Sequence, residues 1–301
     1  MRVHLLLVDG QNDFCVADDG HGNHGTLVVP GADKDMQRAA AMLRRLKGKV
    51  DAISATLDSH QTVGIERPRW WKRVGDGAAP APFTCLGIHP DGKRIVKYTP
   101  GSGSGVNQFG MVPTDEEYTT YMPSYLHREG PTGKGSFGYL QALAAKGRKP
   151  HVIWPVHCCV GQWGWSVVKE LADALAEWEH DRFKRVSYVT KGNNPWTEHF
   201  SGVQAEVPDP KDSSTQVNTH LIQALEEADI IPILGEAFSH CVADTVSGVA
   251  ELFSDPKYVE KMVLLTDASS NVPGFEFLGD AFLKDMKAKG MQTSTTVEFL
   301  A

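Results

Sequence analysis

The sequence has few cysteines, no long apolar run and no excess of positive charge. Its five cysteines include no Cys-x-x-Cys pair, which excludes a four-cysteine zinc ribbon, and their odd number fits reduced thiols better than a disulfide framework. No stretch of eighteen or more apolar residues occurs, so we expect no membrane span. The formal net charge of −7 argues against nucleic acid or an anionic membrane as the main partner.

The chain length and the first residues set two further expectations. With 301 residues the chain can bury a substantial core, and we predict one α/β domain over residues 1–301 rather than two independent ones. The apolar run at residues 5–8 is too short for the core of a signal peptide and is followed directly by Asp9. We therefore expect a cytoplasmic protein.

Strand-like apolar runs alternate with segments of helical spacing along most of the chain. This alternation is typical of a doubly wound, mostly parallel sheet with helices on both faces, which is the α/β fold class we predict. The expected strands are 3–8, 50–56, 151–156, 186–190, 229–234 and 261–266, and the expected helices are 33–47, 164–179, 214–228 and 241–253.

The interval between the second and third expected strands is too long for a plain crossover. Residues 61–150 are rich in Gly and Pro, with a hairpin expected around residues 91–92 and a helix over 136–146. Because structureless loops of such length are rare, we predict a long insertion at about 67–150, packed over the C-terminal edge of the sheet. Its aromatic residues either wall a pocket or form a small core of the insertion itself: Trp70, Trp71, Phe83 and Phe109.

Three strand-like runs each deliver one reactive side chain at their carboxyl end. These are the carboxylate of Asp9, the ammonium of Lys191 and, after a short turn that contains glycine, the thiol of Cys241. Ligands of open parallel sheets bind at this edge. Taken alone, a cysteine in such a sequence is more often a small buried hydrophobe, and an aspartate or lysine after a strand is often a cap or a solvated charge. The prediction of a site therefore depends on the three together.

The chemistry of a cysteine hydrolase assigns a role to each of these residues. We expect Lys191 and a helix that begins at Cys241 to lower the pKa of the thiol. Asp9 would take the proton from Cys241 and later return it to the leaving amine. The backbone N–H groups of Ala237 and Cys241 would face the oxyanion of a tetrahedral intermediate.

A second group of side chains suits a divalent metal ion. Asp58 and His60 form an Asp-x-His pair after the expected strand 50–56, and His157 follows the expected strand 151–156. Carboxylate and imidazole ligands of this kind bind zinc, iron or manganese. Capping and surface polarity are the alternative reading of Asp-x-His, and thiolate ligation by Cys158 or Cys159 is another.

Six short blocks carry a family resemblance in a fixed order along the chain. They are residues 8–15 (VDGQNDFC), 57–60 (LDSH), 154–158 (WPVHC), 190–192 (TKG), 198–201 (EHFS) and 239–242 (SHCV). Together they resemble the nicotinamidase group of the isochorismatase-like cysteine hydrolases. The resemblance implies an isochorismatase-like fold, an Asp9-Lys191-Cys241 triad and a cis peptide bond between Glu236 and Ala237.

The same resemblance implies a substrate and its contacts. The expected reaction converts nicotinamide, or a related pyridine carboxamide, to nicotinate and ammonia through a cysteine acyl-enzyme. Phe14 and Trp154 are implied to sandwich the ring while the metal ion binds the ring nitrogen. Phe200 and His240 complete the predicted substrate-binding residues, and Phe200 stands where the family often has tyrosine.

One departure from the family concerns the fourth metal ligand. Compact nicotinamidases have a further ligand, usually His and sometimes Glu, shortly after the Asp-x-His pair. Here the nearest candidate is Glu66, which we predict as that ligand, and Arg67 follows it. A guanidinium cannot ligate a metal, so Arg67 in that place would weaken the site.

Two other functions stay open at this point. The first is a metal-free cysteine amidase that acts on a ureido, carbamoyl or other small amide, and the second is a non-catalytic metal-binding or ligand-binding protein on the same scaffold. In the leading interpretation the cofactor is zinc, with iron or manganese as alternatives, and the partner is a small-molecule amide. The insertion would serve as a lid or as an interface in a homo-oligomer, and the reaction would belong to NAD salvage.

Overall fold

The computed structural model describes residues 1–102 and 105–301, so residues 103–104 of the predicted insertion lie outside the described part. Its main sheet has six strands in the order β11-β10-β9-β1-β2-β8, and every neighbouring pair is parallel. The strands are β1 (Val3–Val8), β2 (Val50–Asp58), β8 (Ser187–Lys191), β9 (Ile231–Gly235), β10 (Met262–Leu265) and β11 (Gln292–Ser294).

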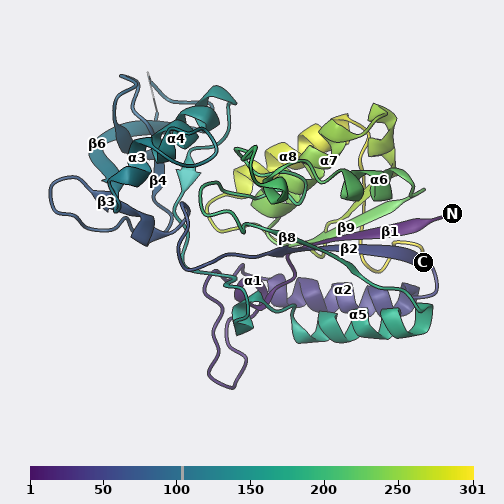
Figure 1. The fold of residues 1–301 in the computed structure, drawn as a ribbon. Helices are drawn as coiled ribbons and strands as arrows, with labels where there is room; N and C mark the ends of the chain where they lie inside the picture. Colours follow the sequence, from purple (N-terminus) through teal and green to yellow (C-terminus); the bar gives the residue numbers. More distant parts are fainter. Residues whose placement is uncertain (103–104) are drawn as a thin grey trace.

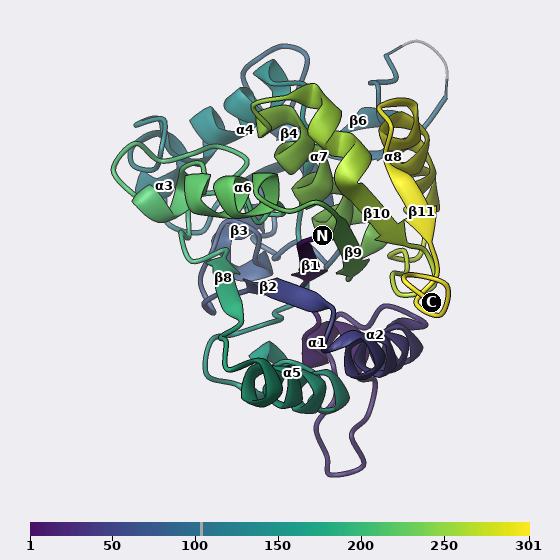
Figure 2. The ribbon, with the colours of Figure 1, turned by 90° about the vertical axis from the view of Figure 1, so that its right-hand side faces the viewer.

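Helices cover both faces of this sheet, as the alternating pattern predicted. In Figures 1 and 2, α2 (Ala32–Leu46) and α5 (Lys169–Arg182) lie on one face, and α6 (Thr219–Glu226), α7 (Ala243–Leu252) and α8 (Glu276–Ala288) lie on the other. No helix in the described ranges has both the length and the hydropathy that a membrane crossing needs. The predicted fold class is therefore confirmed.

The central strand β1 shows why both faces are covered. Its six residues are all buried, and successive side chains of a strand point to opposite faces. Leu5 and Leu7 join the core beneath α2 and α5, whereas Leu6 and Val8 join the core beneath α6, α7 and α8. A continuous apolar run of this kind is typical of a strand in a parallel sheet that is buried on both sides.

The insertion forms a second, antiparallel sheet with its own core. The strand order is β3-β6-β5-β4-β7, and Trp70 and Trp71 belong to the core that this sheet shares with α4. The insertion lies beyond the carboxyl ends of the main strands, and both termini lie at the opposite end (Figure 1). The elements are β3 (Trp71–Arg73), β4 (Cys85–Ile88), β5 (Ile95–Pro100), β6 (Met111–Thr120), β7 (His151–Val152), α3 (Ser124–His127) and α4 (Gly135–Ala145).

The expected strand at 151–156 is wrong as a member of the main sheet. Only β7 is a strand there, and it pairs with β4 of the insertion in antiparallel fashion. The run is apolar because it passes between the insertion and the main sheet, where Ile153 and Trp154 are buried. Burial on two sides produces the same apolar pattern in a connecting segment as in a parallel strand.

Other boundaries also differ from the prediction. The helix expected at 164 begins only at residue 169, because a short 3₁₀ turn (Trp163–Trp165) precedes it, and the helix expected at 214 begins at residue 219. A short helix α1 (Asn12–Cys15) follows β1, and neither this helix nor β11 and α8 was predicted. The hairpin around residues 91–92 is confirmed by the antiparallel pairing of β4 with β5.

Candidate active site

Asp9, Lys191 and Cys241 meet at the carboxyl edge of the main sheet. They follow β1, end β8 and follow β9, and their side chains are all buried. The Lys191 Nζ atom lies 2.8 Å from Asp9 Oδ2 and 3.5 Å from Cys241 Sγ. The parallel sheet thus brings together three residues that are far apart in the sequence.

Two neighbours hold the carboxylate of Asp9 in place. The Thr56 hydroxyl on β2 donates a hydrogen bond of 2.5 Å to Asp9 Oδ1, and the Lys191 ammonium holds the other oxygen. Asp9 itself has a positive φ of 45°, a conformation that aspartate adopts more readily than most residues. The carboxylate is therefore fixed beside the thiol.

Burial and neighbouring charges together set the pKa values of the three residues. Burial disfavours the charge of Lys191, but the carboxylates of Asp58 and Asp9 outweigh it and hold the pKa of Lys191 well above its usual value. Burial also raises the pKa of Asp9, although the nearby Lys191 ammonium opposes the shift. Lys191 therefore keeps its positive charge, and it lies next to the carboxyl group of Asp9, which is a better base than an exposed aspartate.

The predicted lowering of the thiol pKa is wrong. Burial raises the pKa of Cys241 well above its usual value, and the charges of Asp9 and Asp58 add to that effect while Lys191 opposes it. The thiol therefore keeps its proton at neutral pH, and a nucleophilic thiolate requires a base. Asp9 is the base within the same cluster, because it is held by the same ammonium that touches the thiol.

The turn around Cys241 presents backbone donors to the cavity. Cys241 lies in a π-helical turn (Phe238–Val242) that leads into α7, and the peptide bond between Glu236 and Ala237 is cis, as the resemblance implied. Ala237 and Cys241 both line the cavity. Within residues 1–102 and 105–301 the Ala237 N–H donates to no other group, so it is free to meet an oxyanion.

Asp58, His60 and His157 form a compact group of metal-ligating side chains. Asp58 Oδ2 lies 3.0 Å from the Nε2 atoms of both histidines, and the ligand atoms of all three residues lie within 4.8 Å of one another. A buried set of two imidazoles and one carboxylate fits a divalent ion such as zinc. No cysteine sulfur joins this group among the described residues, which argues against ligation by Cys158 or Cys159.

Glu66, the predicted fourth ligand, lies on the far side of His60. Its Oε1 atom is 3.3 Å from Nδ1 of His60, whereas Nε2 of that ring faces Asp58 and His157. Glu66 therefore orients His60 and does not join the group of candidate ligands. The Arg67 guanidinium also reaches the group, because its Nη1 atom lies 3.0 Å from Nδ1 of His157 and its Nε atom lies 2.9 Å from Glu66.

A glycine is required next to Lys191. Gly192 has a φ of 87°, and a Cβ atom there would lie 2.8 Å from Cε1 of His60. Both the backbone conformation and the close approach exclude larger residues. The Lys-Gly pair thus lets the triad and the metal-ligating group share one edge of the sheet.

Cys241 and the metal-ligating group line one small cavity of about 30 Å³, and Asp9 and Lys191 lie buried behind Cys241. Its walls include all four predicted substrate-binding residues, which are Phe14, Trp154, Phe200 and His240. The rings of Trp154 and His240 are 5.3 Å apart, and Phe200 packs against both. The structure therefore places Cys241, the candidate metal ligands and the predicted aromatic residues around one cavity.

His240 and Trp154 each place an unpartnered polar atom at this cavity. Burial lowers the pKa of His240 well below its usual value, so the imidazole is neutral. Ser239 Oγ accepts from the Val272 N–H and lies 3.0 Å from His240 Nδ1; when its hydroxyl donates to Nδ1, the ring proton is on Nε2. Neither His240 Nε2 nor Trp154 Nε1 has a hydrogen-bond partner in the described part of the chain.

Two residues of the site were not given a role from sequence. Thr56 binds Asp9, and its only signal was its position near the end of β2. Glu198 lines the cavity, and burial raises its pKa to about 7, so its carboxyl group is partly protonated at neutral pH. Glu198 lies in one of the six blocks that carry the resemblance, which was the signal available for it.

Solved structures of similar fold provide a comparison. The yeast nicotinamidase bound to the inhibitor nicotinaldehyde has 17% identity and a TM-score of 0.58, covering 97% of this chain and 99% of its own. The nicotinamidase/pyrazinamidase of Acinetobacter baumanii has 16% identity and a TM-score of 0.56, with coverage of 99% and 98%. The pyrazinamidase of Pyrococcus horikoshii in complex with zinc has 17% identity and a TM-score of 0.50, with coverage of 98% and 99%.

At these identities the likeness shows the fold. The sequence matches no protein-family model and no curated protein. The fold shared with nicotinamidases and pyrazinamidases extends over nearly the whole chain, including the insertion.

Proposed function

We propose that the protein is a cysteine amidohydrolase that converts nicotinamide, or a related pyridine carboxamide, to the corresponding acid and ammonia. The observation that carries the proposal is the contact of Lys191 with both Asp9 and Cys241, the last of which lines the cavity. A binding protein has no need of three mutually dependent reactive groups, so this contact also argues against a non-catalytic role. The fold shared with nicotinamidases supports the same reaction.

The residues support a two-step mechanism. Asp9 takes the proton of Cys241, and the sulfur attacks the carbonyl carbon of the amide. The oxyanion that forms accepts hydrogen bonds from the N–H groups of Ala237 and Cys241. When the C–N bond breaks, Asp9 returns its proton to the leaving nitrogen, so that ammonia departs and a thioester remains.

The second step hydrolyses the thioester. Asp9, again a carboxylate, takes a proton from water as the water attacks the thioester carbon. The C–S bond then breaks, the acid leaves and Cys241 recovers its proton from Asp9. Lys191 keeps its charge throughout, since it is paired with Asp58 as well as with Asp9.

Asp58, His60 and His157 would hold a divalent ion in this scheme, with zinc first and iron or manganese as alternatives. Such an ion supplies a Lewis acid that orients the ring nitrogen of the substrate. Phe14 and Trp154 would then stack on the two faces of the ring, and Phe14 already lies 5.5 Å from the His157 ring. Turnover of nicotinamide would place the enzyme in NAD salvage in the cytoplasm.

A second candidate is a metal-free amidase that acts on a ureido or carbamoyl compound. One observation favours it: the Arg67 guanidinium lies 3.0 Å from His157 Nδ1 and places a fixed positive charge beside the residues that would hold the ion. Like charges at this distance repel, which would weaken the binding of a divalent cation.

The test is ammonia release by the purified protein from nicotinamide, ureidoacrylate and a simple aliphatic amide. We expect release from nicotinamide by the unaltered protein, none by Cys241→Ala, and normal release by Cys15→Ala, which removes another buried thiol as a matched control. Release from ureidoacrylate alone would favour the metal-free amidase. Equal release by Cys241→Ala would rule out both cysteine mechanisms.

A further inference from the structure

A large apolar pocket lies next to the catalytic cavity. It has a volume of about 550 Å³, which is within the range of small-molecule sites. One wall comes from β4, β5 and the start of β6 in the insertion, and the other comes from residues 274–278. Apolar side chains dominate the lining, among them Phe83, Met111, Val152, Phe275 and Leu278.

The pocket adjoins the candidate catalytic cavity. Phe200 and His240 line both spaces, so these two side chains form the boundary between them. The cavity itself, at about 30 Å³, has the volume of roughly one water molecule. Because even a single aromatic ring exceeds this volume, a substrate must displace the boundary or extend past Phe200, which is only partly buried.

The opposite end of the cavity is closed. Asp9 and Thr56 are fully buried and Lys191 is 1% exposed, so the space around the catalytic base has no room for a substituent. In the proposed reaction the leaving nitrogen takes its proton from Asp9 and must lie at that end. An extension of the substrate therefore belongs on the acyl part, which becomes the product acid, and the leaving group stays small.

Two polar atoms next to this boundary are buried without a partner in the described part of the chain. They are Trp154 Nε1, which is a donor, and His240 Nε2, which is a donor when Nδ1 accepts from the Ser239 hydroxyl. Leaving such donors unpaired is costly. An acceptor atom of the substrate at this boundary would satisfy them. Beyond it, the apolar lining favours a hydrocarbon group.

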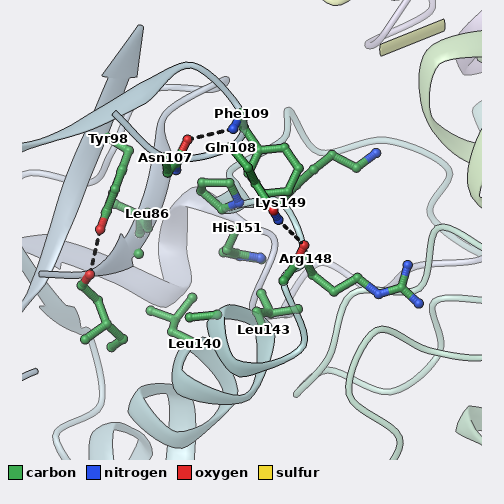
Figure 3. A pocket seen from close by; sticks show the side chains of 15 residues that line it. Leu86, Tyr98, Asn107, Gln108, Phe109, Leu140, Leu143, Arg148, Lys149 and His151 are labelled. Carbon is green, nitrogen blue, oxygen red and sulfur yellow. Dashed lines mark hydrogen bonds between the residues drawn. The ribbon is translucent and has the colours of Figure 1, made fainter. Parts of the chain in front are cut away.

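The insertion holds the far wall of the pocket rigid. Tyr98 and Phe109 line this pocket and also a neighbouring one of about 330 Å³ (Figure 3), so they form the partition between the two. The Tyr98 hydroxyl donates to the Ile88 carbonyl at 2.7 Å, and the Phe109 N–H donates to the Asn107 side chain at 2.9 Å (Figure 3). A preformed wall of this kind lowers the entropic cost of binding.

We propose that this pocket binds an apolar extension on the acyl part of the amide substrate, with an acceptor atom such as an ether oxygen beside Trp154 and His240, where the extension passes the boundary. The proposal rests on the proposed function for the orientation of the scissile amide. It makes the substrate a substituted aromatic carboxamide, larger than nicotinamide itself.

Calorimetric titration of the Cys241→Ala protein tests the pocket without turnover. We expect 5-butoxynicotinamide to bind at least tenfold more tightly than nicotinamide, because each buried methylene contributes roughly fourfold in affinity before the ordering of the chain is subtracted. Met111→Trp and Leu278→Trp fill the pocket from opposite walls, and each should remove this gain. Met122→Trp makes the same change as Met111→Trp at an exposed position of the insertion and should preserve it.

Equal or weaker binding of the butoxy compound, or a gain that survives both pocket-filling variants, would overturn the proposal. Ammonia release from nicotinamide by the unaltered protein is measured in parallel. Turnover of nicotinamide without an affinity gain would reject the pocket and keep the proposed reaction. An affinity gain that the two variants remove, in a protein that releases no ammonia, would reject the reaction and keep the pocket.

Discussion

Removal of the buried Lys191 charge should lower the stability of the protein much more than removal of an exposed lysine charge. Lys191 Nζ lies 2.8 Å from Asp9 and 3.0 Å from Asp58, and all three side chains are buried. Lys191→Met keeps most of the side-chain length and leaves the buried Asp9 carboxylate without a cation, whereas Asp58 keeps its contact with His60. Loss of one partner from a buried ion pair costs about 3–5 kcal/mol. At about 2 °C for each kcal/mol in a chain of this size, Tm should fall by roughly 6–10 °C.

Thermal melts followed by circular dichroism provide the assay. Lys169→Met is the matched control, because Lys169 makes an exposed ion pair of 2.7 Å with Asp173. This variant should melt at the same temperature as the unaltered protein. Asp9→Asn added to Lys191→Met should restore part of the stability, since it removes the carboxylate that has lost its cation. A Lys191→Met variant as stable as the control, or no recovery in the double variant, would refute the reasoning.

The remaining predictions concern pH and metal. Because burial raises the pKa of Cys241, its alkylation by iodoacetamide should be slow at neutral pH and should still accelerate above pH 9.0, the ordinary pKa of the thiol. A plateau below that pH would contradict this. Burial lowers the pKa of His151 from 6.5 to about 4, so the native chain binds fewer protons than the unfolded chain in that window. The free energy of unfolding should therefore fall by up to about 3 kcal/mol as the pH drops from 6.5 to 4. Urea unfolding of His151→Leu should show a weaker dependence of that free energy on pH. An unchanged dependence in the variant would count against this prediction. Chelation should raise KM for nicotinamide more than it lowers kcat, since the ion at Asp58, His60 and His157 orients the ring; full activity in metal-stripped protein would exclude that role.

The meeting of the three candidate catalytic residues was largely predictable from the sequence because a parallel sheet obeys a simple geometric rule. Asp9, Lys191 and Cys241 each follow a strand-like run, and the carboxyl ends of parallel strands share one edge. Strand β1 was equally clear, since a strand buried on both faces reads as a continuous apolar run.

Tertiary burial explains what the sequence concealed. Residues 151–156 are apolar because the insertion covers them, and periodicity does not distinguish such a segment from a strand. Strand β11 has three residues, Gln292–Ser294, without an apolar signal. The direction of the Cys241 pKa depends on how deeply the thiol is buried, and the place of Glu66 depends on which nitrogen of His60 it faces. Neither quantity has a signature in residue spacing.

The most direct test of the central claim is mass spectrometry of the protein quenched with acid during turnover of nicotinamide. We predict a thioester adduct on the peptide that contains Cys241, and its loss together with turnover in Cys241→Ala. Ammonia release that persists in Cys241→Ala without any adduct would contradict the account.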